Sequence, residues 1–278
     1  MKNIFKSPVS GFCLGLILIA SSCQKMDRPE LGEYPLDANP PGGPLKFYTA
    51  LDGSNVDSIR ATFGTATNAN YVDDGISGKA YQGSADSYIT YPAANDFNKS
   101  TSFTIAFWMK TPPPDPGIGA QFIFGQATST DIWTKSDIFL LMEDGGQSNN
   151  GMAALKFYLF DQWLEFVGDY RLPVADDEWH HLAFVYDESS SKLTTYVDGE
   201  AVTGLPANKT DVMKDGAPRG KLDLSKATGL VIGGPSHRAV GATPDGWMVN
   251  YRGQLDQFRI YGESLPASEI QSLFQNKL

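Results

Sequence analysis

The sequence predicts an all-β domain closed by one short helix. Segments in which apolar and polar residues alternate recur along the chain, with turn residues between them, and this period of two is typical of half-buried strands. The 278 residues include 28 Gly, 17 Pro and 12% aromatic side chains, a composition that favours strands joined by many turns. This excludes a coiled coil, and the hydrophobic content of 41% excludes disorder along the whole length.

The first 22 residues are predicted to be a lipoprotein signal peptide. Lys2 and Lys6 precede an apolar stretch at 11–20 that is too short to cross a bilayer of about 30 Å as a helix. Three small residues then lead to Cys23, which resembles a bacterial lipobox, although leucine is commoner in the first of these positions. Cys23 is the only cysteine left after cleavage, so we expect it to carry a lipid anchor. The alternative is an ordinary secretory signal with an incidental cysteine.

Residues 23–44 are predicted to be a flexible tether. They are polar and rich in proline, and they show no periodicity. Residues 24–27 also resemble the short export signals that send lipoproteins of Bacteroidetes-type bacteria to the outer face of the outer membrane. We therefore expect a protein that is anchored in the outer membrane by lipid and exposed at the cell surface, with a periplasmic location as the alternative.

The charge balance argues against a nucleic-acid partner. The chain has 22 Lys+Arg against 32 Asp+Glu, a formal net charge of −10, whereas nucleic-acid binding depends on cation-rich patches that neutralise phosphates. No run of five basic residues occurs. The acidic surface is typical of a soluble domain, and it does not indicate an oligomeric state.

Residues 45–278 are predicted to form the folded domain. Strand patterns occur at 103–109, 139–142, 155–159, 163–167, 181–186, 193–197, 230–232 and 255–261. In the first of these segments the alternation is strict. It places Phe103, Ile105, Phe107 and Met109 on one face, and we expect this face to be buried.

Two local signals define a hairpin and the helix. Asp198-Gly199 follows a strand pattern and predicts a type I′ turn, because such a turn needs a positive φ at both central residues. Near the C-terminus, Ile270, Leu273 and Phe274 have helical spacing after Pro266, which suits the first turn of a helix. We expect one short helix to close the domain.

Four motifs occur in a fixed order and carry a family resemblance. They are SFTIAFWMK at 102–110, EWHHLAFVYD at 178–187, KLTTYVDGE at 192–200 and GQLDQFRIYGESLPASEI at 253–270. Together they resemble a laminin-G-like domain of the concanavalin A-like lectin/glucanase superfamily, and the resemblance covers 45–278. It implies a jelly-roll sandwich of two antiparallel sheets whose N- and C-terminal strands pair. Pro266 departs from the family pattern, which usually has a serine helix cap there.

The superfamily holds both enzymes and binding modules, so the fold alone does not define the activity. Retaining glucanases on this scaffold carry Glu-x-Asp-x-x-Glu, because their chemistry needs two carboxyl groups about 5–5.5 Å apart. No such pattern occurs here, and the nearest acidic pairs, Glu143-Asp144 and Glu165 with Asp169, do not have the required spacing. We expect no catalytic residue. A glycoside hydrolase or polysaccharide lyase of the same superfamily is the alternative.

Two tryptophans are the candidate platforms for a carbohydrate ligand. Trp133 and Trp247 lie among polar loop residues, with no strand alternation to bury them. A sugar packs its apolar face on an aromatic ring and needs hydrogen-bond partners for its hydroxyl groups. Candidate partners near Trp247 are His237, Arg238, Asp245 and Tyr251. We expect non-catalytic binding of a glycan or glycoconjugate, with a protein-binding adhesin or scaffold as a further alternative.

Two acidic residues are candidate ligands of a structural calcium ion. Asp256 alternates with Phe258 and Ile260 and is therefore expected to point inward, where an unpaired carboxylate is costly. Its partner is either a polar side chain or a cation. Oxygen ligands suit Ca²⁺, some relatives hold one, and Asp52 is the candidate companion. Hydrogen bonds without a metal are favoured over this cofactor.

Overall fold

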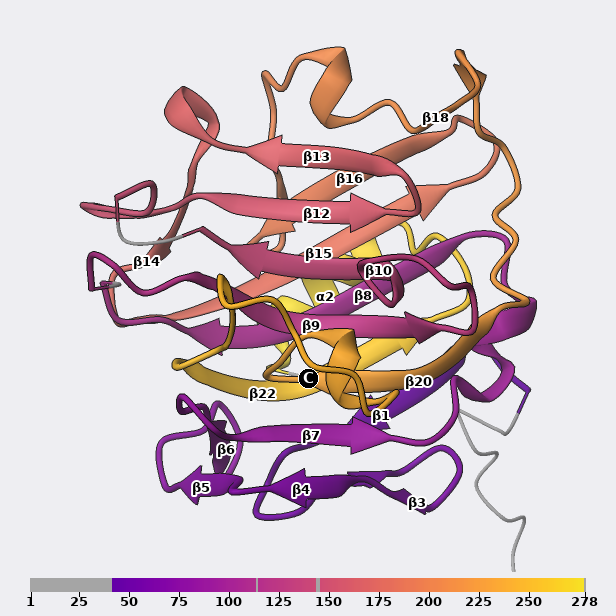
Figure 1. Ribbon diagram of the computed structural model, residues 1–278. Coiled ribbons are helices and arrows are strands. Elements are labelled where there is room, and N and C mark those ends of the chain that lie inside the picture. Colours follow the sequence, from indigo (N-terminus) through magenta and orange to yellow (C-terminus); the bar gives the residue numbers. More distant parts are fainter. Residues whose placement is uncertain (1–41, 114, 144–145, 278) are drawn as a thin grey trace, which may run out of the picture. The chain divides into compact units, whose positions relative to one another are not determined.

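The computed structural model describes residues 42–113, 115–143 and 146–277, which form a sandwich of two main sheets (Figure 1). This confirms the all-β, jelly-roll-like fold. The signal peptide, Cys23 and most of the tether lie outside the described residues, so the lipid anchor stays a prediction. No described helix is both long and apolar enough to cross a membrane.

The first sheet contains the two terminal strands of the domain. Its order is β17-β16-β15-β8-β22-β6-β5, and β1 also pairs with β22. These strands are β1 (Leu45–Thr49), β5 (Asn70–Val72), β6 (Ala80–Gln82), β8 (Phe103–Lys110), β15 (Trp179–Asp187), β16 (Lys192–Val197), β17 (Glu200–Ala201) and β22 (Gln254–Tyr261). Phe47 of β1 lies opposite Ile260 of β22. The expected pairing of the N- and C-terminal strands is therefore confirmed.

The second sheet faces the viewer in Figure 1. Its order is β13-β12-β10-β9-β20-β7-β4, and β21 pairs with β9 in parallel. These strands are β4 (Thr65–Thr67), β7 (Tyr88–Tyr91), β9 (Ala120–Thr128), β10 (Ser136–Met142), β12 (Leu155–Leu159), β13 (Gln162–Phe166), β20 (Ala227–Ile232) and β21 (Met248–Asn250). The small pairs are β2 (Val56–Asp57) with β3 (Thr62–Phe63), β11 (Gly151–Ala153) with β14 (Leu172–Ala175), and β18 (Met213–Lys214) with β19 (Ala217–Pro218).

Aromatic rings fill the space between the two sheets. Phe107 of β8 lies with its ring centroid 5.8 Å from that of Phe124 on β9 and 5.4 Å from that of Phe258 on β22. All three rings are fully buried, and each such side chain contributes about 1.5–3 kcal/mol relative to an exposed one. The predicted inner face of β8 belongs to this core throughout.

The helix α2 (Ala267–Gln275) packs on the outer face of the first sheet, where Ile270 contacts Ala106 and Ala183. Pro266 is the N-cap of α2 and so precedes the first turn in which it was expected. At the predicted hairpin, Asp198 and Gly199 have φ of 50° and 81°, which confirms the type I′ signal. The described 3₁₀ helices are η1 (Asn95–Lys99), η2 (Gly168–Tyr170), η3 (Ala207–Lys209) and η4 (Ser236–Arg238).

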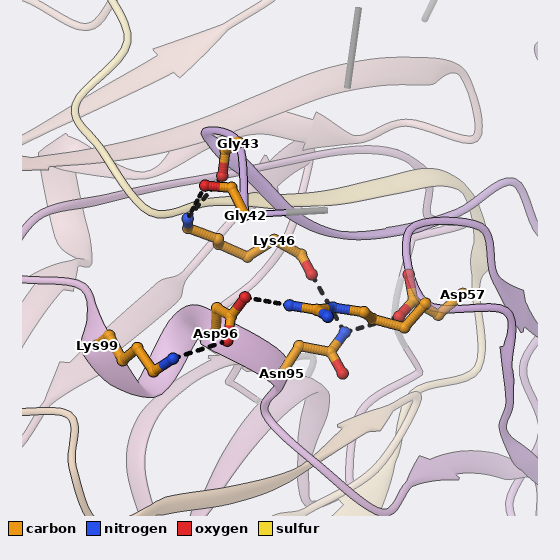
Figure 2. A network of polar contacts seen from close by, with 8 residues as sticks. Gly42, Gly43, Lys46, Asp57, Asn95, Asp96 and Lys99 are labelled. Carbon is orange, nitrogen blue, oxygen red and sulfur yellow. Dashed lines mark hydrogen bonds and ion pairs between the residues drawn. The ribbon is translucent and has the colours of Figure 1, made fainter. Parts of the chain in front are cut away.

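A polar network fixes the start of the folded domain (Figure 2). Lys46 Nζ donates to the carbonyl oxygen of Gly43 at 2.6 Å. Asn95 Nδ2 donates to the carbonyl oxygen of Lys46 and to Asp57 Oδ2, at 3.1 and 2.7 Å. Asp96, the next residue of η1, forms ion pairs with Arg60 and Lys99. These contacts hold β1 against η1 and β2.

Candidate functional site

Six aromatic rings form a continuous line across the outer face of the second sheet, which we call the aromatic row. From β13 to the loops, the successive ring centroids are 5.1, 4.6, 5.1, 5.9 and 6.2 Å apart. The members are Trp163, Tyr158, Phe139, Phe122, Trp247 and Trp133. The first four come from the neighbouring strands β13, β12, β10 and β9, and the last two come from loops.

Solvent reaches the aromatic row mainly at its loop end. Trp133 and Trp247 are 52% and 42% exposed, whereas Phe122, Phe139 and Tyr158 are buried. The two indoles were predicted independently from segments far apart in the sequence, and the structure brings them together with an interplanar angle of 48°. The strand residues behind them provide a rigid apolar support.

The loop that carries Trp133 joins β9 to β10 and is fixed at both ends. The main-chain N–H of Ser129 donates to the carbonyl oxygen of Lys226 at 2.9 Å. Thr134 Oγ1 donates to the carbonyl oxygen of Ser136 at 2.9 Å, and Lys135 forms an ion pair with Asp131 at 2.7 Å. This loop therefore holds the indole in place over the sheet.

The segment that carries Trp247 is held by η4. Ser236 Oγ donates to Ser136 Oγ at 2.9 Å, which fastens η4 to β10. A Cβ atom at Gly125 would lie 2.3 Å from Ser236 Oγ, so this close approach requires glycine on β9. Further along, the N–H of Met248 donates to the carbonyl oxygen of Asp245 at 2.9 Å and closes the turn that presents Trp247.

Three of the predicted polar contacts lie around this loop pair. His237 is 5% exposed, and burial lowers the pKa of its imidazole while the main chain of Trp133 and the charge of Asp245 act against this shift. Arg238 lies over the ring of Tyr88 at 5.1 Å. Asp245 is exposed. His237 thus supports Trp133 from below, and Asp245 is the member of this set that solvent reaches most freely.

The expectation that Tyr251 lines the site is wrong. Its side chain is fully buried, and its hydroxyl group is 2.5 Å from Thr111 Oγ1. Burial also raises the pKa of this phenol. The segment that the sequence pattern presented as one long loop contains β21, which pairs with β9. Tyr251 follows that strand directly and enters the core between the sheets.

A family model described as "Concanavalin A-like lectin/glucanases superfamily" matches residues 82–271. The chain belongs to this superfamily. No curated protein matches the chain. Among solved structures it is similar to domain 4 of AbnA, a GH43 extracellular arabinanase from Geobacillus stearothermophilus in complex with arabinotriose, with 19% identity and a TM-score of 0.54 over 83% of this chain and 98% of that chain.

Other structures with a similar fold belong to proteins of different kinds. The binding domain of botulinum neurotoxin serotype D is 13% identical, with a TM-score of 0.54 over 84% of this chain and 52% of that chain. Trypanosoma rangeli sialidase is 17% identical, with a TM-score of 0.51 over 84% of this chain and 33% of that chain. At these identities the similarity shows the fold alone, so the site must be judged on its own residues.

Two glutamates of this concanavalin A-like domain form an arrangement that the sequence pattern did not reveal. Glu143 and Glu165 both contact Lys156 Nζ, at 2.5 and 3.0 Å. The sequence placed each glutamate near an aspartate, but the sheet pairs Lys156 with Glu165 in register and brings Glu143 to the other side of the lysine. Although burial opposes it, hydrogen bonds to both carboxylates raise the pKa of Lys156. The triad lies beside Trp163, whose ring centroid is 5.9 Å from Lys156 Nζ.

The direction expected for Asp256 needs a correction. A β-bulge interrupts β22 between Asp256 and Arg259, and Gln257 has a φ of 52°. Asp256 therefore pairs with Trp108, whereas Ile260 pairs with the core residue Ile105. The carboxylate is buried as expected, but it does not share the face of Phe258 and Ile260.

Main-chain N–H groups are the hydrogen-bond partners of the Asp256 carboxylate, which favours the alternative without a metal over a calcium site. Asp256 Oδ2 accepts the N–H groups of Ile76 and Ser77 at 2.7 and 3.2 Å, and its Oδ1 accepts that of Gln257 at 2.8 Å. Asp52 Oδ1 accepts the N–H of Lys79 at 2.8 Å. Burial raises the pKa of Asp256 to about 6. Within the described ranges no three His, Cys, Asp or Glu side chains are grouped to hold a metal ion, whereas Ca²⁺ takes six to eight oxygen ligands.

Proposed function

We propose that this protein is a cell-surface lipoprotein whose domain binds a glycan, without catalysis, at the exposed end of the aromatic row. The observation that carries the proposal is the pair of neighbouring indoles, Trp133 and Trp247, with centroids 6.2 Å apart and a supporting line of rings behind them. Hydration of large apolar rings at the surface is unfavourable, and a ligand that covers them removes this cost. A sugar ring offers the matching apolar face.

The ligand class has independent support from the similar structures. The arabinanase domain that matches 83% of this chain is described in complex with arabinotriose, and the matching toxin domain is described as a binding domain. Both share this fold. A glycan is therefore the ligand that we favour for the aromatic row.

The non-catalytic part of the proposal rests on the Glu143–Lys156–Glu165 triad. Glycoside hydrolysis needs one neutral carboxylic acid and one carboxylate on either side of the scissile bond. The ammonium group of Lys156 pairs with both glutamates and lies between them. It also occupies the space in which a substrate would have to lie.

Retention on polysaccharide tests the proposal. The purified chain should be retained on a cognate polysaccharide from a panel, without releasing new reducing ends. Trp133→Ala or Trp247→Ala should weaken this retention by about 1–3 kcal/mol, the range known for stacking of bases on aromatic side chains. The matched control is Phe63→Ala, which removes a ring that is 72% exposed on β3, outside the aromatic row.

A second pair of variants separates binding from hydrolysis. Glu143→Gln and Glu165→Gln should leave retention unchanged. If the wild-type chain releases a hydrolysed product and either glutamine variant abolishes that release, the enzyme alternative replaces the binding proposal. Equal retention of the wild-type chain and both tryptophan variants would show that the ligand binds elsewhere, as a protein-binding adhesin or scaffold would allow.

A further inference from the structure

A pocket of about 390 Å³ lies on the second sheet, next to the aromatic row. Its walls come from the loop after β9, the turn between β12 and β13, and the segment that leads from β18 to β20, which meet on the right side of the view in Figure 1. Tyr158 belongs to both the pocket and the aromatic row, and Ile132 of the pocket precedes Trp133 in the chain. The pocket volume falls within the range of about 300–1,000 Å³ that is usual for small-molecule sites.

Positive charge gathers at this pocket although the protein is acidic. Lys214, Lys221 and Lys226 line it together with Arg219. Arg219 is paired with Asp161, and Asp223 of the lining lies near Lys226 and Lys214, whose charges help to lower its pKa. Among the described residues, Lys221 has no ion-pair partner. Counted with Asp137, Asp161 and Asp223, the four basic side chains give the pocket lining a formal net charge of +1, whereas the whole chain carries −10. This local excess of positive charge favours an anionic ligand.

The pocket also contains a buried acceptor. Asp137 is 4% exposed, and its Oδ2 has no hydrogen-bond partner among the described residues. Burial raises the pKa of this carboxyl group, opposed by a hydrogen bond with Thr128. A buried oxygen without a partner costs about 1–3 kcal/mol, and a ligand that donates a hydroxyl hydrogen would remove that cost.

Apolar surface completes the set of contacts. Phe160, Ile132 and Leu222 line the same pocket, and the guanidinium group of Arg219 lies over the ring of Phe160 at 4.9 Å. A ligand that fits here has a carboxylate for the lysines, hydroxyl groups for Asp137 and an apolar face for the ring. Inorganic sulfate lacks the hydroxyl groups and the apolar face, inorganic phosphate lacks the apolar face, and neutral sugars lack the carboxylate.

We propose that this pocket binds a uronic-acid unit of an acidic glycan whose neighbouring units lie on the aromatic row. The inference rests on the proposed glycan-binding function and adds the chemical class of the sugar. Lys214, Lys221 and Lys226 pair with the ligand carboxylate, Asp137 accepts a ring hydroxyl, and Phe160 packs against the sugar face. Tyr158 connects the pocket to the aromatic row.

Calorimetric titration of the full chain with matched ligands tests this assignment. The probes are trigalacturonic acid, its neutral methyl ester and a glucuronate-containing hyaluronan tetrasaccharide. At least one acidic probe should bind, and trigalacturonic acid should bind about tenfold tighter than its ester, with the difference shrinking at high salt. Lys221→Ala and Lys226→Ala should each weaken binding of the acid about two- to fivefold. Asp137→Asn should weaken it about tenfold.

The controls make failure of this inference distinct from failure of the proposed function. The control is Lys79→Ala. Lys79 directly precedes β6 of the first sheet and forms an ion pair with Asp73, so this variant should bind the probes as the wild type does. If acid and ester bind equally and only the tryptophan variants lose affinity, the pocket assignment is overturned and the glycan-binding function stands. If the acid depends on Asp137 and Lys221 but not on the tryptophans, the pocket assignment stands and the aromatic row is not the platform. If none of the probes binds, the pocket assignment is overturned.

Discussion

Asp256 shows how one irregular residue in the main chain decides what a side chain does. Alternation along 255–261 predicts burial of the carboxylate correctly, but the positive φ of Gln257 moves Asp256 to the other face of β22. There it accepts three main-chain N–H groups, where the sequence suggested a polar side chain or a cation. A β-bulge depends on pairing with neighbouring strands, and a single strand pattern does not contain that information.

Removal of the Asp256 carboxylate should destabilise the domain. Asp256→Ala leaves three N–H groups without an acceptor, and we expect the free energy of unfolding to fall by about 1–3 kcal/mol. Denaturant unfolding measures this change. The matched control is Asp52→Ala, because Asp52 is exposed and accepts one N–H. EDTA should leave the melting temperature of the wild type unchanged, and a fall in that temperature would reinstate the calcium site.

His180 should make stability depend on pH. Its Nδ1 lies 2.8 Å from Asp198 Oδ2 and its Nε2 lies 3.1 Å from Asp176 Oδ1. The pKa of this imidazole is raised above 6.5, mainly by the hydrogen bond with Asp198, although burial acts in the opposite direction. The folded state thus binds the proton more tightly than the unfolded state, so this contribution is complete below pH about 6.5 and is lost as the pH rises through the raised pKa.

A comparison of His180 with its neighbour His181 tests the direction of this pH dependence. Burial lowers the pKa of His181 to about 4, so its contribution is present above pH 6.5 and is lost as the pH falls towards 4. We expect the free energy of unfolding of the wild type, measured from pH 4 to 9, to fall on the alkaline side. This fall should disappear in His180→Gln and persist in His181→Gln. An unchanged alkaline slope in His180→Gln would assign the titration to another group.

At the scale of elements, alternation finds strands of both sheets, including β10, which is buried at every residue, but it misses the equally buried β9. Each of the predicted strand segments corresponds to a strand of the structure, with ends that differ by a few residues. The central strand β9 was not predicted because its three consecutive apolar residues at 122–124 are followed by Gly125 and Gln126, so its sequence shows no period of two. β21 was missed for a different reason, since its three residues depend on parallel pairing with β9.

The same limit applies to the candidate site. Trp133 and Trp247 could be predicted because polar neighbours mark their loops as exposed. The supporting rings Phe122, Phe139 and Tyr158 could not be predicted as a line, because the order of β9, β10 and β12 in the sheet brings them together. Asp137 was also missed, since nothing in its local sequence indicates that the side chain is buried.

We expect η4 to be the element that positions Trp247, and Gly125 is the residue that lets η4 approach β9 closely. Gly125→Ala would place a methyl group 2.3 Å from Ser236 Oγ and push η4 away from the sheet. We expect a stability loss of about 1–3 kcal/mol from overpacking, together with weaker retention on the cognate polysaccharide. The control is Gly246→Ala, which adds the same methyl group in open space and should keep wild-type retention. Equal retention of both variants would contradict this role of η4.

At the scale of the whole molecule, the sandwich is a support and the site lies on its surface. The core between the sheets is filled by rings and aliphatic side chains. The aromatic row and the neighbouring pocket both lie on the outer face of the second sheet. Similar folds occur in an arabinanase, a sialidase and a neurotoxin binding domain, so a fold that is predictable from four motifs does not by itself define an activity.

The proposed lipid on Cys23 would hold the whole protein at the membrane. With a net charge of −10, the chain as a whole is not attracted to anionic headgroups, so the attachment that we propose depends on acyl chains, each buried CH₂ of which contributes about 0.8 kcal/mol. Cys23→Ala should therefore release soluble protein or leave an uncleaved precursor, whereas a high-salt wash should not release the wild type. Metabolic labelling with fatty acid, followed by membrane fractionation, measures both. A Cys23→Ala protein that still takes up the label and stays with the membrane would place the lipid elsewhere.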